Sequence, residues 1–432
     1  MAPRPRPADL RLGFFEKLGL LPIFAAVLGK TFWTALTAKF KSKHKRPTSF
    51  ARLLGYTAVR TLTANNTSRT EQFLAPGTDD SYLAYCKRFN VQPATETLKD
   101  GTNAYWVGSK GAEKVWIFFH GGGYSVPAAP EQFNLVHSLI TDLGPAAPNG
   151  IAALVLHYDV APFAAYPRQL GQAAQLLNHV LRNLRVAPRN VVLGGDSAGG
   201  NLTLALLSHI LHPHPDAAAV PAVELRDFSS EEAVVAGRAD SVAEGFSFSS
   251  NSEVSAAAVE GGGGGGGDES SSASNNSNNN ERLLAAVLIS PWVSFDTTTK
   301  SYTTNRSRDM IAAAAISRWS TLFLGGRPTD PYNEPVDVPA GWWKGLGGTV
   351  RDVLFVAGEY EVLLDGILNC AESVRNEWRP GPSGSGGEGG EVACVLAEGE
   401  GHVACWVDTM WGFGFEELKM YTETREWLRG KV

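Results

Sequence analysis

Cysteine is scarce in this chain of 432 residues, which contains only Cys86, Cys370, Cys394 and Cys405. So few cysteines in so long a chain make no disulfide framework, and no C-x-x-C pair indicates zinc. A reducing compartment is favoured. We therefore expect an intracellular protein without a metal ion.

Positive charge is also scarce outside the first 60 residues. Residues 1–60 contain twelve Lys/Arg and two acidic residues, whereas the remaining 372 residues carry a net charge of −16. The densest basic part is KFKSKHKR at 39–46, and such runs are most often solvated segments. No recognised nucleic-acid-binding motif accompanies it, so we expect no nucleic-acid partner.

The chain lacks an uninterrupted hydrophobic run of membrane-spanning length. The apolar stretch at 18–38 is long enough to cross a bilayer, but it contains Pro22 and the central Lys30. No small-x-small cleavage site closes it, so it fits a signal peptide poorly. Two hypotheses remain open: residues 1–46 lie on an anionic membrane surface, or residues 1–60 form a helical cap on the main domain.

Short apolar runs recur through the rest of the chain, at 115–119, 152–156, 190–194, 284–290, 352–357 and 392–396. Their continuous apolarity is typical of strands buried on both faces. Helical spacing lies between them, most clearly at 169–186. This alternation predicts an α/β fold in residues 61–432, with a mostly parallel central sheet and helices on both faces.

Residues 215–280 interrupt that rhythm with seven consecutive glycines followed by DESSSASNNSNNN. This composition cannot bury enough apolar surface to order itself, so we predict a disordered insertion. A shorter Gly-rich loop at 380–390 precedes the last apolar run. Lengthening a surface loop costs little, because closure entropy grows with the logarithm of its length.

The stretch GDSAG at 195–199 matches G-x-S-x-G at the point where a strand turns into a helix. Glycines permit the strained turn that exposes a serine hydroxyl above the sheet. Ser197 is therefore a candidate nucleophile. The alternative is a small residue in a tight turn.

The stretch HGGGY at 120–124 follows the first apolar run. Consecutive glycines expose N–H groups that can bind the oxygen that becomes negative when Ser197 attacks a carbonyl. The stretch matches no nucleotide-binding pattern. Gly122, Gly123 and Ala198 are the candidate oxyanion donors, and a flexible loop is the alternative.

A serine needs a base, which is usually histidine, and the base needs a carboxylate to orient it. His402, in the Gly-rich stretch EGEGH, follows the last apolar run. Among the acids before it, Glu361 lies in the loop after the strand at 352–357 and is the first choice. Asp365 is the reserve acid, and a structural role for these two and for Glu359 remains open.

With HGGGY, GDSAGG and GEGH in this order, the chain resembles the hormone-sensitive-lipase-like branch of the α/β-hydrolase superfamily from about residue 105 onward. YDVAPFAAYP at 158–167 is similar to that branch's Y-R-L-A-P-E-x-x-x-P stretch. The resemblance implies that Ser197 is the nucleophile, His402 the base and Glu361 the acid. Glu361 stands where the family usually has aspartate, which leaves Asp365 as an alternative.

The resemblance implies an esterase that forms an acyl-enzyme without a cofactor, and a small hydrophobic ester as its substrate. The basic, apolar N-terminus is similar to that of microsomal members that remove acetyl groups from sterols or arylamides. This similarity implies a cytoplasmic protein or one at the endoplasmic reticulum membrane. An arylamide deacetylase and a non-catalytic ligand receptor are the alternative functions, and the sequence does not predict an oligomeric state.

Overall fold

The computed structural model describes residues 12–40, 46–47, 49–147, 149–217, 282–379 and 389–432. Apart from residues 215–217, the predicted insertion at 215–280 lies outside the described residues. So do most of the Gly-rich loop at 380–390 and most of the basic run at 39–46.

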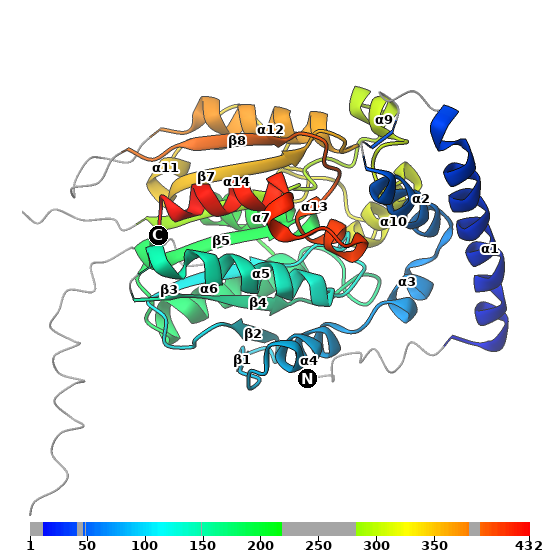
Figure 1. Ribbon diagram of the computed structural model, residues 1–432. Coiled ribbons are helices and arrows are strands. Elements are labelled where there is room, and N and C mark those ends of the chain that lie inside the picture. The colour runs from blue at the N-terminus through cyan, green and yellow to red at the C-terminus, as the bar shows by residue number, and fades with distance from the viewer. Residues whose placement is uncertain (1–11, 41–45, 48, 148, 218–281, 380–388) are drawn as a thin grey trace, which may run out of the picture.

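Eight strands form one sheet in the order β1-β2-β4-β3-β5-β6-β7-β8 (Figure 1). From β4 to β8 the neighbouring strands are parallel, whereas β2 pairs antiparallel with both β1 and β4. The strands are β1 (Thr95–Thr97), β2 (Asn103–Val107), β3 (Lys114–Phe119), β4 (Ile151–His157), β5 (Val191–Asp196), β6 (Leu283–Ile289), β7 (Val350–Gly358) and β8 (Val392–Ala397).

The six predicted apolar runs coincide with β3 to β8, which confirms the expected parallel sheet. Strands β5 and β6 are buried along their whole length, which explains why their sequences do not alternate. The sequence did not predict β1 and β2. The Thr-Glu-Thr sequence of β1 at the sheet edge carries no apolar signal, and β2 is only five residues long.

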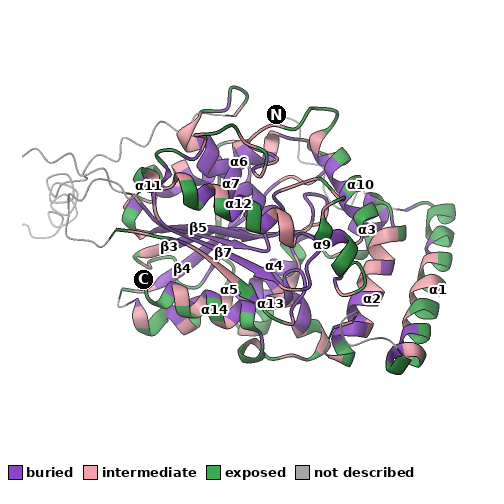
Figure 2. Ribbon diagram, turned by 90° about the horizontal axis from the view of Figure 1, so that it is seen from above, coloured by how far each residue is buried: buried purple, intermediate pink, exposed green. Residues whose placement is uncertain are grey.

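Helices cover both faces of the sheet, and each face has its own hydrophobic core (Figure 2). One face carries α4 (Thr78–Phe89), α5 (Pro130–Leu143), α13 (Ala404–Val407) and α14 (Lys419–Arg429). The other face carries α6 (Arg168–Asn178), α7 (Ala198–Leu211), α11 (Leu346–Thr349) and α12 (Leu364–Glu377). A π-helical turn at His179–Asn183 extends α6, so the helix predicted at 169–186 is confirmed.

The N-terminal helices gather at the end of the sheet where the parallel strands finish (Figure 1). They are α1 (Phe14–Thr37), α2 (Phe50–Asn65) and α3 (Ser68–Leu74), and they lie near α9 (Lys300–Asn305) and α10 (Ala313–Leu324). This arrangement confirms an N-terminal helical cap. Helix α2 continues across residue 60, where the sequence analysis places its domain boundary.

The two Gly-rich segments join the body at the opposite, amino edge of the sheet. Helix α7 runs from the carboxyl edge back to the amino edge. The described residues end at Ala217 and begin again at Arg282, just before β6. Helix α12 likewise returns to the amino edge, and the next gap separates it from β8. Both Gly-rich segments therefore attach at the edge away from Ser197.

Candidate active site

Ser197 forms the whole connection between β5 and α7, at the carboxyl edge of the sheet. Its backbone has φ 54° and ψ −117°, a strained conformation for a residue with a side chain. Gly199 packs so closely against β3 that a Cβ atom there would lie 1.8 Å from the carbonyl oxygen of Phe119. The turn therefore needs glycine at this position, and it holds the Ser197 side chain above the strand end.

Ser197, His402 and Glu361 form a continuous chain of hydrogen bonds. The Ser197 Oγ lies 2.9 Å from Nε2 of His402, and Nδ1 of the same ring lies 2.9 Å from Oε2 of Glu361. His402 and Glu361 are buried, and Ser197 is 8% exposed. A carboxylate on Nδ1 fixes the tautomer in which Nε2 is free to accept the serine proton.

Asp365 takes no part in this chain of hydrogen bonds. It lies in the first turn of α12, where its Oδ2 accepts a hydrogen bond of 2.7 Å from the N–H of Ser301. Glu361 instead lies in the loop between β7 and α12. The structure thus brings Glu361, and not the reserve acid Asp365, to His402.

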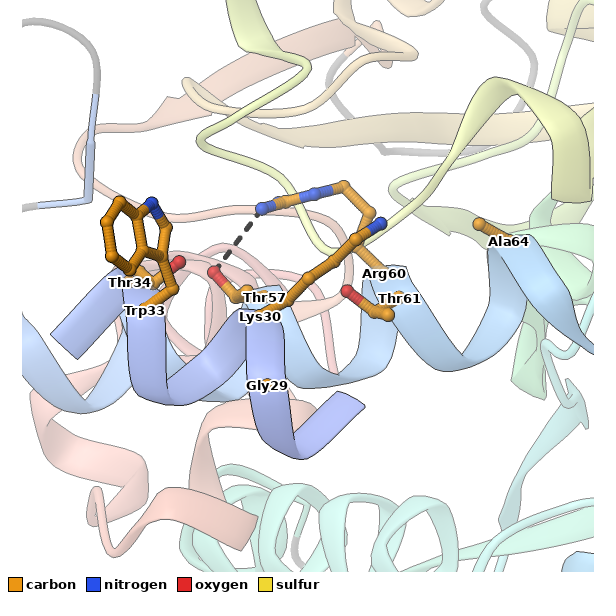
Figure 3. Close-up of a pocket in the computed structure, with 8 residues that line it drawn as sticks. All are labelled: Gly29, Lys30, Trp33, Thr34, Thr57, Arg60, Thr61 and Ala64. Atoms are coloured by element: carbon orange, nitrogen blue, oxygen red, sulfur yellow. Dashed lines mark hydrogen bonds between the residues drawn. The ribbon is translucent and has the colours of Figure 1, made fainter. Parts of the chain in front are cut away.

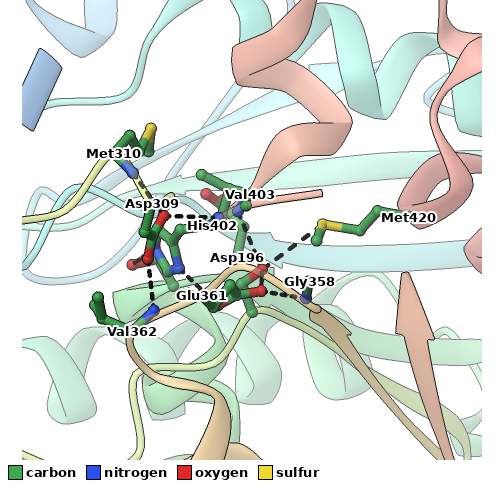
Figure 4. A network of polar contacts seen from close by, with 12 residues as sticks. Asp196, Asp309, Met310, Gly358, Glu361, Val362, His402, Val403 and Met420 are labelled. Atoms are coloured by element: carbon green, nitrogen blue, oxygen red, sulfur yellow. Dashed lines mark hydrogen bonds and ion pairs between the residues drawn. The ribbon is translucent and has the colours of Figure 1, made fainter. Parts of the chain in front are cut away.

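Further polar groups hold the Glu361 carboxylate in place (Figure 4). Its Oε1 accepts hydrogen bonds from the N–H of Gly358 at 2.5 Å and from the Ser290 hydroxyl at 2.6 Å. The Ser290 hydroxyl in turn accepts a hydrogen bond from the N–H of Val403 at 3.1 Å. Ser290 therefore connects the acid to the residue after the histidine, a role that no sequence motif indicated.

Asp309 is a buried carboxylate that the sequence analysis missed. Its Oδ1 accepts a hydrogen bond from the His402 N–H at 3.1 Å, and its Oδ2 accepts one from the Val362 N–H at 2.7 Å (Figure 4). Burial raises the pKa of Asp309 to about 6, against the lowering effect of His402. Asp309 thus ties the histidine loop to the segment that carries Glu361.

The surroundings of His402 favour its protonated form. Burial alone would lower the pKa of His402, but the hydrogen bond and charge of Glu361 oppose it. The charges of Asp309 and Asp196 act in the same direction, and the net result is a raised pKa. An imidazole in this environment is well suited to hold a proton taken from Ser197.

The glycine-rich loop after β3 is attached to the turn at Ser197 through Asp196. Its carboxylate accepts hydrogen bonds of 2.9 Å from the N–H of Gly121 and 3.0 Å from the indole of Trp406. Among the described residues, no protein acceptor binds the N–H groups of Gly122, Gly123 or Ala198. These three open donors adjoin Ser197 in the chain or in the attached loop, where an oxyanion would need them.

Helix α2 supports the histidine loop from the N-terminal side. The Arg52 Nε donates a hydrogen bond of 2.5 Å to Asp408, and another Arg52 N–H donates to the carbonyl oxygen of Gly399 at 3.0 Å. The Tyr56 hydroxyl donates to the second oxygen of Asp408 at 2.8 Å. Since Arg52, Tyr56 and Asp408 are all buried, α2 is part of the support on which His402 rests.

No group of three or more His, Cys, Asp or Glu side chains arranged for a metal ion occurs in the part of the chain that the structure describes. The four cysteines are all unpaired, and three of them are buried. The absence of a cofactor stays a prediction.

Residues 116–234 match a protein family described as alpha/beta hydrolase fold. "Putative acetyl-hydrolase LipR" of Mycobacterium tuberculosis is 40% identical over 90 residues, which are 21% of this chain and 27% of that protein. "Steryl acetyl hydrolase 1" of Saccharomyces cerevisiae is 32% identical over 106 residues, which are 24% and 23% of the two chains. The matched segments therefore span about a quarter of the length of these relatives.

Solved structures resemble the chain over most of its length. A crystal structure of an esterase from the bacterial hormone-sensitive lipase family has a TM-score of 0.53 at 20% identity, covering 89% of this chain and 99% of that one. An esterase/lipase from an uncultured bacterium has a TM-score of 0.51 at 18% identity, covering 87% and 98%. Residues 116–234 thus match the alpha/beta hydrolase family, and the chain has the α/β-hydrolase fold that these solved esterases share.

Proposed function

We propose that the protein is a serine hydrolase that cleaves carboxylic esters through an acyl-enzyme. The observation that carries this proposal is the buried chain of 2.9 Å contacts from Ser197 through His402 to Glu361. Its order of nucleophile, base and acid is the one that acyl transfer requires. The esterase and acetyl-hydrolase names of the similar proteins support the same reaction class.

In the proposed mechanism, Ser197 Oγ attacks the ester carbonyl while His402 Nε2 takes its proton. The negative oxygen of the tetrahedral intermediate accepts hydrogen bonds from the N–H groups of Gly122, Gly123 and Ala198. His402 then protonates the leaving alcohol, and an acyl group remains on Ser197. Water, deprotonated by His402, attacks this acyl group, and His402 gives the proton to Ser197 Oγ as the bond to the acyl group breaks, which releases the acid and restores the serine.

We propose acetyl or short acyl esters of a hydrophobic alcohol as the substrates. The indole of Trp319 lies against Gly123, so closely that a Cβ atom there would be 2.5 Å from the ring. The indole N–H donates a hydrogen bond of 2.9 Å to Glu71, which fixes the ring beside the glycine-rich loop after β3. A fixed bulky ring at this position favours a small acyl group. The acetyl-hydrolase names of the two curated relatives support the same choice.

The test is hydrolysis of p-nitrophenyl acetate, butyrate and octanoate by the purified full-length protein and by Ser197→Ala. We expect the fastest turnover with acetate, and a loss on the order of 10⁶-fold in kcat for the variant. Matched acetanilides distinguish an amidase, which would cleave them at least as fast as the esters. The absence of turnover on every ester and anilide would leave only the receptor alternative.

We further propose that residues 1–46 associate with an intracellular membrane surface, such as that of the endoplasmic reticulum. The segment Phe14–Phe40 is long and apolar enough to cross a membrane by length and composition, and only 11% of its most apolar window is buried. Helix α1 nevertheless packs along α2. This packing favours a helix that lies on the membrane over one that spans it.

A further inference from the structure

Helix α1 directs an apolar face away from the protein. Its inner face packs along α2 and buries Leu20 and Thr34. On the opposite side, at intervals of three, four or seven residues, lie the exposed side chains of Phe14, Leu18, Leu21, Leu28, Phe32 and Leu36. We call these six residues the outer stripe. It follows a helix of 24 residues, roughly 36 Å long, and an exposed apolar stripe of this size marks an interaction surface.

A cavity of about 470 Å³ lies between α1 and α2 (Figure 3). Lys30 from α1 and Arg60 from α2 bring two cations to it, and both side chains extend to the same side of the helix pair. Hydroxyl groups come from Thr34, Thr57 and Thr61. No carboxylate lines this cavity in the described chain, so its lining is cationic and rich in hydrogen-bond donors.

Arg60 has neutral hydrogen-bond partners. One N–H group donates to the carbonyl oxygen of Asp309, and another lies 3.4 Å from the Thr57 hydroxyl. In the residues that the structure describes, neither Arg60 nor Lys30 forms an ion pair with a carboxylate. Burial lowers the pKa of Arg60, against the raising effect of Asp309. The Asp309 charge thus acts on Arg60 without a direct ion pair, so an anion in the cavity would still gain hydrogen bonds and charge attraction from Arg60.

We propose that this cavity binds the phosphate group of an anionic phospholipid while the outer stripe lies in the apolar layer of the same membrane. Phosphate oxygens accept hydrogen bonds from ammonium, guanidinium and hydroxyl groups together, which matches the donors of Lys30, Arg60, Thr34 and Thr61; the Thr57 hydroxyl already donates to the carbonyl oxygen of Leu53. Trp33, which also lines the cavity, is 66% exposed and suits the interface between headgroups and acyl chains. The inference rests on the membrane association proposed above.

The experiment is flotation of the full-length protein with vesicles of phosphatidylcholine alone or with one-third phosphatidic acid. The decisive variants are Lys30→Gln, in the cavity, and Lys17→Gln, which removes the same charge from an exposed position elsewhere on α1. Loss of one lysine near an anionic surface weakens binding about fivefold. For Lys17→Gln we expect this loss of about fivefold alone. For Lys30→Gln we expect the same loss multiplied by a further factor of about five or more, because a phosphate contact is lost as well. Equal losses would overturn the cavity as a binding site.

A second variant tests the cavity without changing charge. Thr61→Val removes one donor, and we expect weaker binding to phosphatidic acid vesicles but unchanged melting by circular dichroism. Unchanged vesicle binding would count against the site. Binding of inorganic phosphate to the protein without vesicles is compared with binding of chloride at matched ionic strength. Phosphate binding as tight as binding to the phosphatidic acid vesicles would overturn a phospholipid as the occupant.

The same experiment separates this inference from membrane association itself. If the wild-type protein does not float with either kind of vesicle, both membrane association and the phosphate site are wrong. If it floats and the double variant Leu28→Ser, Phe32→Ser does not, the outer stripe docks on the membrane. The two lysine variants then decide the cavity alone.

Discussion

The central sheet and the N-terminal helices differ in which side chains they bury and which they expose. Strands β5 and β6 are enclosed on both faces and consist almost wholly of apolar residues and glycine. Helix α1 instead exposes Leu28 and Phe32, while α2 buries the guanidinium of Arg52 against the histidine loop. Apolar burial stabilises the sheet, whereas α2 combines the buried apolar side chains of Leu53 and Tyr56 with a buried ion pair between Arg52 and Asp408. The apolar residues of a segment therefore do not reveal which of its sides faces inward.

The largest effect is expected inside the body, at Glu361. Replacement by glutamine keeps the shape but removes the charge that orients His402, and we expect kcat for p-nitrophenyl acetate to fall on the order of 10⁴-fold. The matched control is Asp365→Asn, four residues further along, whose partner is the N–H of Ser301. We expect less than a tenfold change there. The opposite ranking would show that Asp365 is the functional acid.

The next effect concerns the attachment of α2. Arg52→Met leaves the buried carboxylate of Asp408 without its cation, and loss of one partner of a buried pair costs about 3 kcal/mol of unfolding free energy. Arg69→Met breaks the exposed pair with Glu16 and should cost about 0–1 kcal/mol. Urea unfolding of both variants measures the difference. Similar unfolding midpoints would mean that α2 is held by apolar packing, which would erase the contrast with the sheet.

A smaller effect is expected in the pH profile. His402 must be neutral to accept the serine proton, so kcat/KM should rise with pH through a His402 pKa that lies above the ordinary value of about 6.5. Asp309→Asn removes a negative charge that raises this pKa, and we expect the midpoint to move down by about one unit. A purely structural role for Asp309 would lower kcat without moving the midpoint.

The smallest effect on folding is expected at the surface of α1. Leu28→Ala removes a side chain that is 72% exposed, and its unfolding free energy should stay within about 0.5 kcal/mol of the wild type. Leu288→Ala, in the fully buried β6, makes the same substitution and should cost about 2–5 kcal/mol. A large loss for Leu28→Ala would show that α1 belongs to the folding core after all.

The sequence predicted those parts of the fold whose local residue pattern is typical of a single kind of structure. Continuous apolar runs predicted β3 to β8, and G-x-S-x-G predicted the turn at Ser197, because these signals are local. Strand β1 escaped because its three residues are polar and lie at the sheet edge. For α1 the pattern predicted a helix but not its orientation, since apolar residues occur on both of its faces.

The candidate site was predictable where a motif names a residue, and unpredictable where only folding brings residues together. Asp309 lies 93 residues from His402 in the chain and belongs to no motif, so only the three-dimensional structure reveals their contact. The choice between Glu361 and Asp365 depends on where α12 begins. One acid lies before the helix and faces His402, whereas the other lies in its first turn.

The two edges of the sheet experience different constraints on chain length. At the carboxyl edge, hydrogen bonds join the loops that carry Ser197, Glu361 and His402, and another joins the loop at Gly121 to Asp196. At the amino edge, the chain leaves at Ala217 and returns at Arg282, on the far side of the strands from Ser197. Closing a longer loop there adds only a logarithmic entropy cost. A reporter domain inserted between Ala217 and Arg282 should therefore label the protein without disturbing the site.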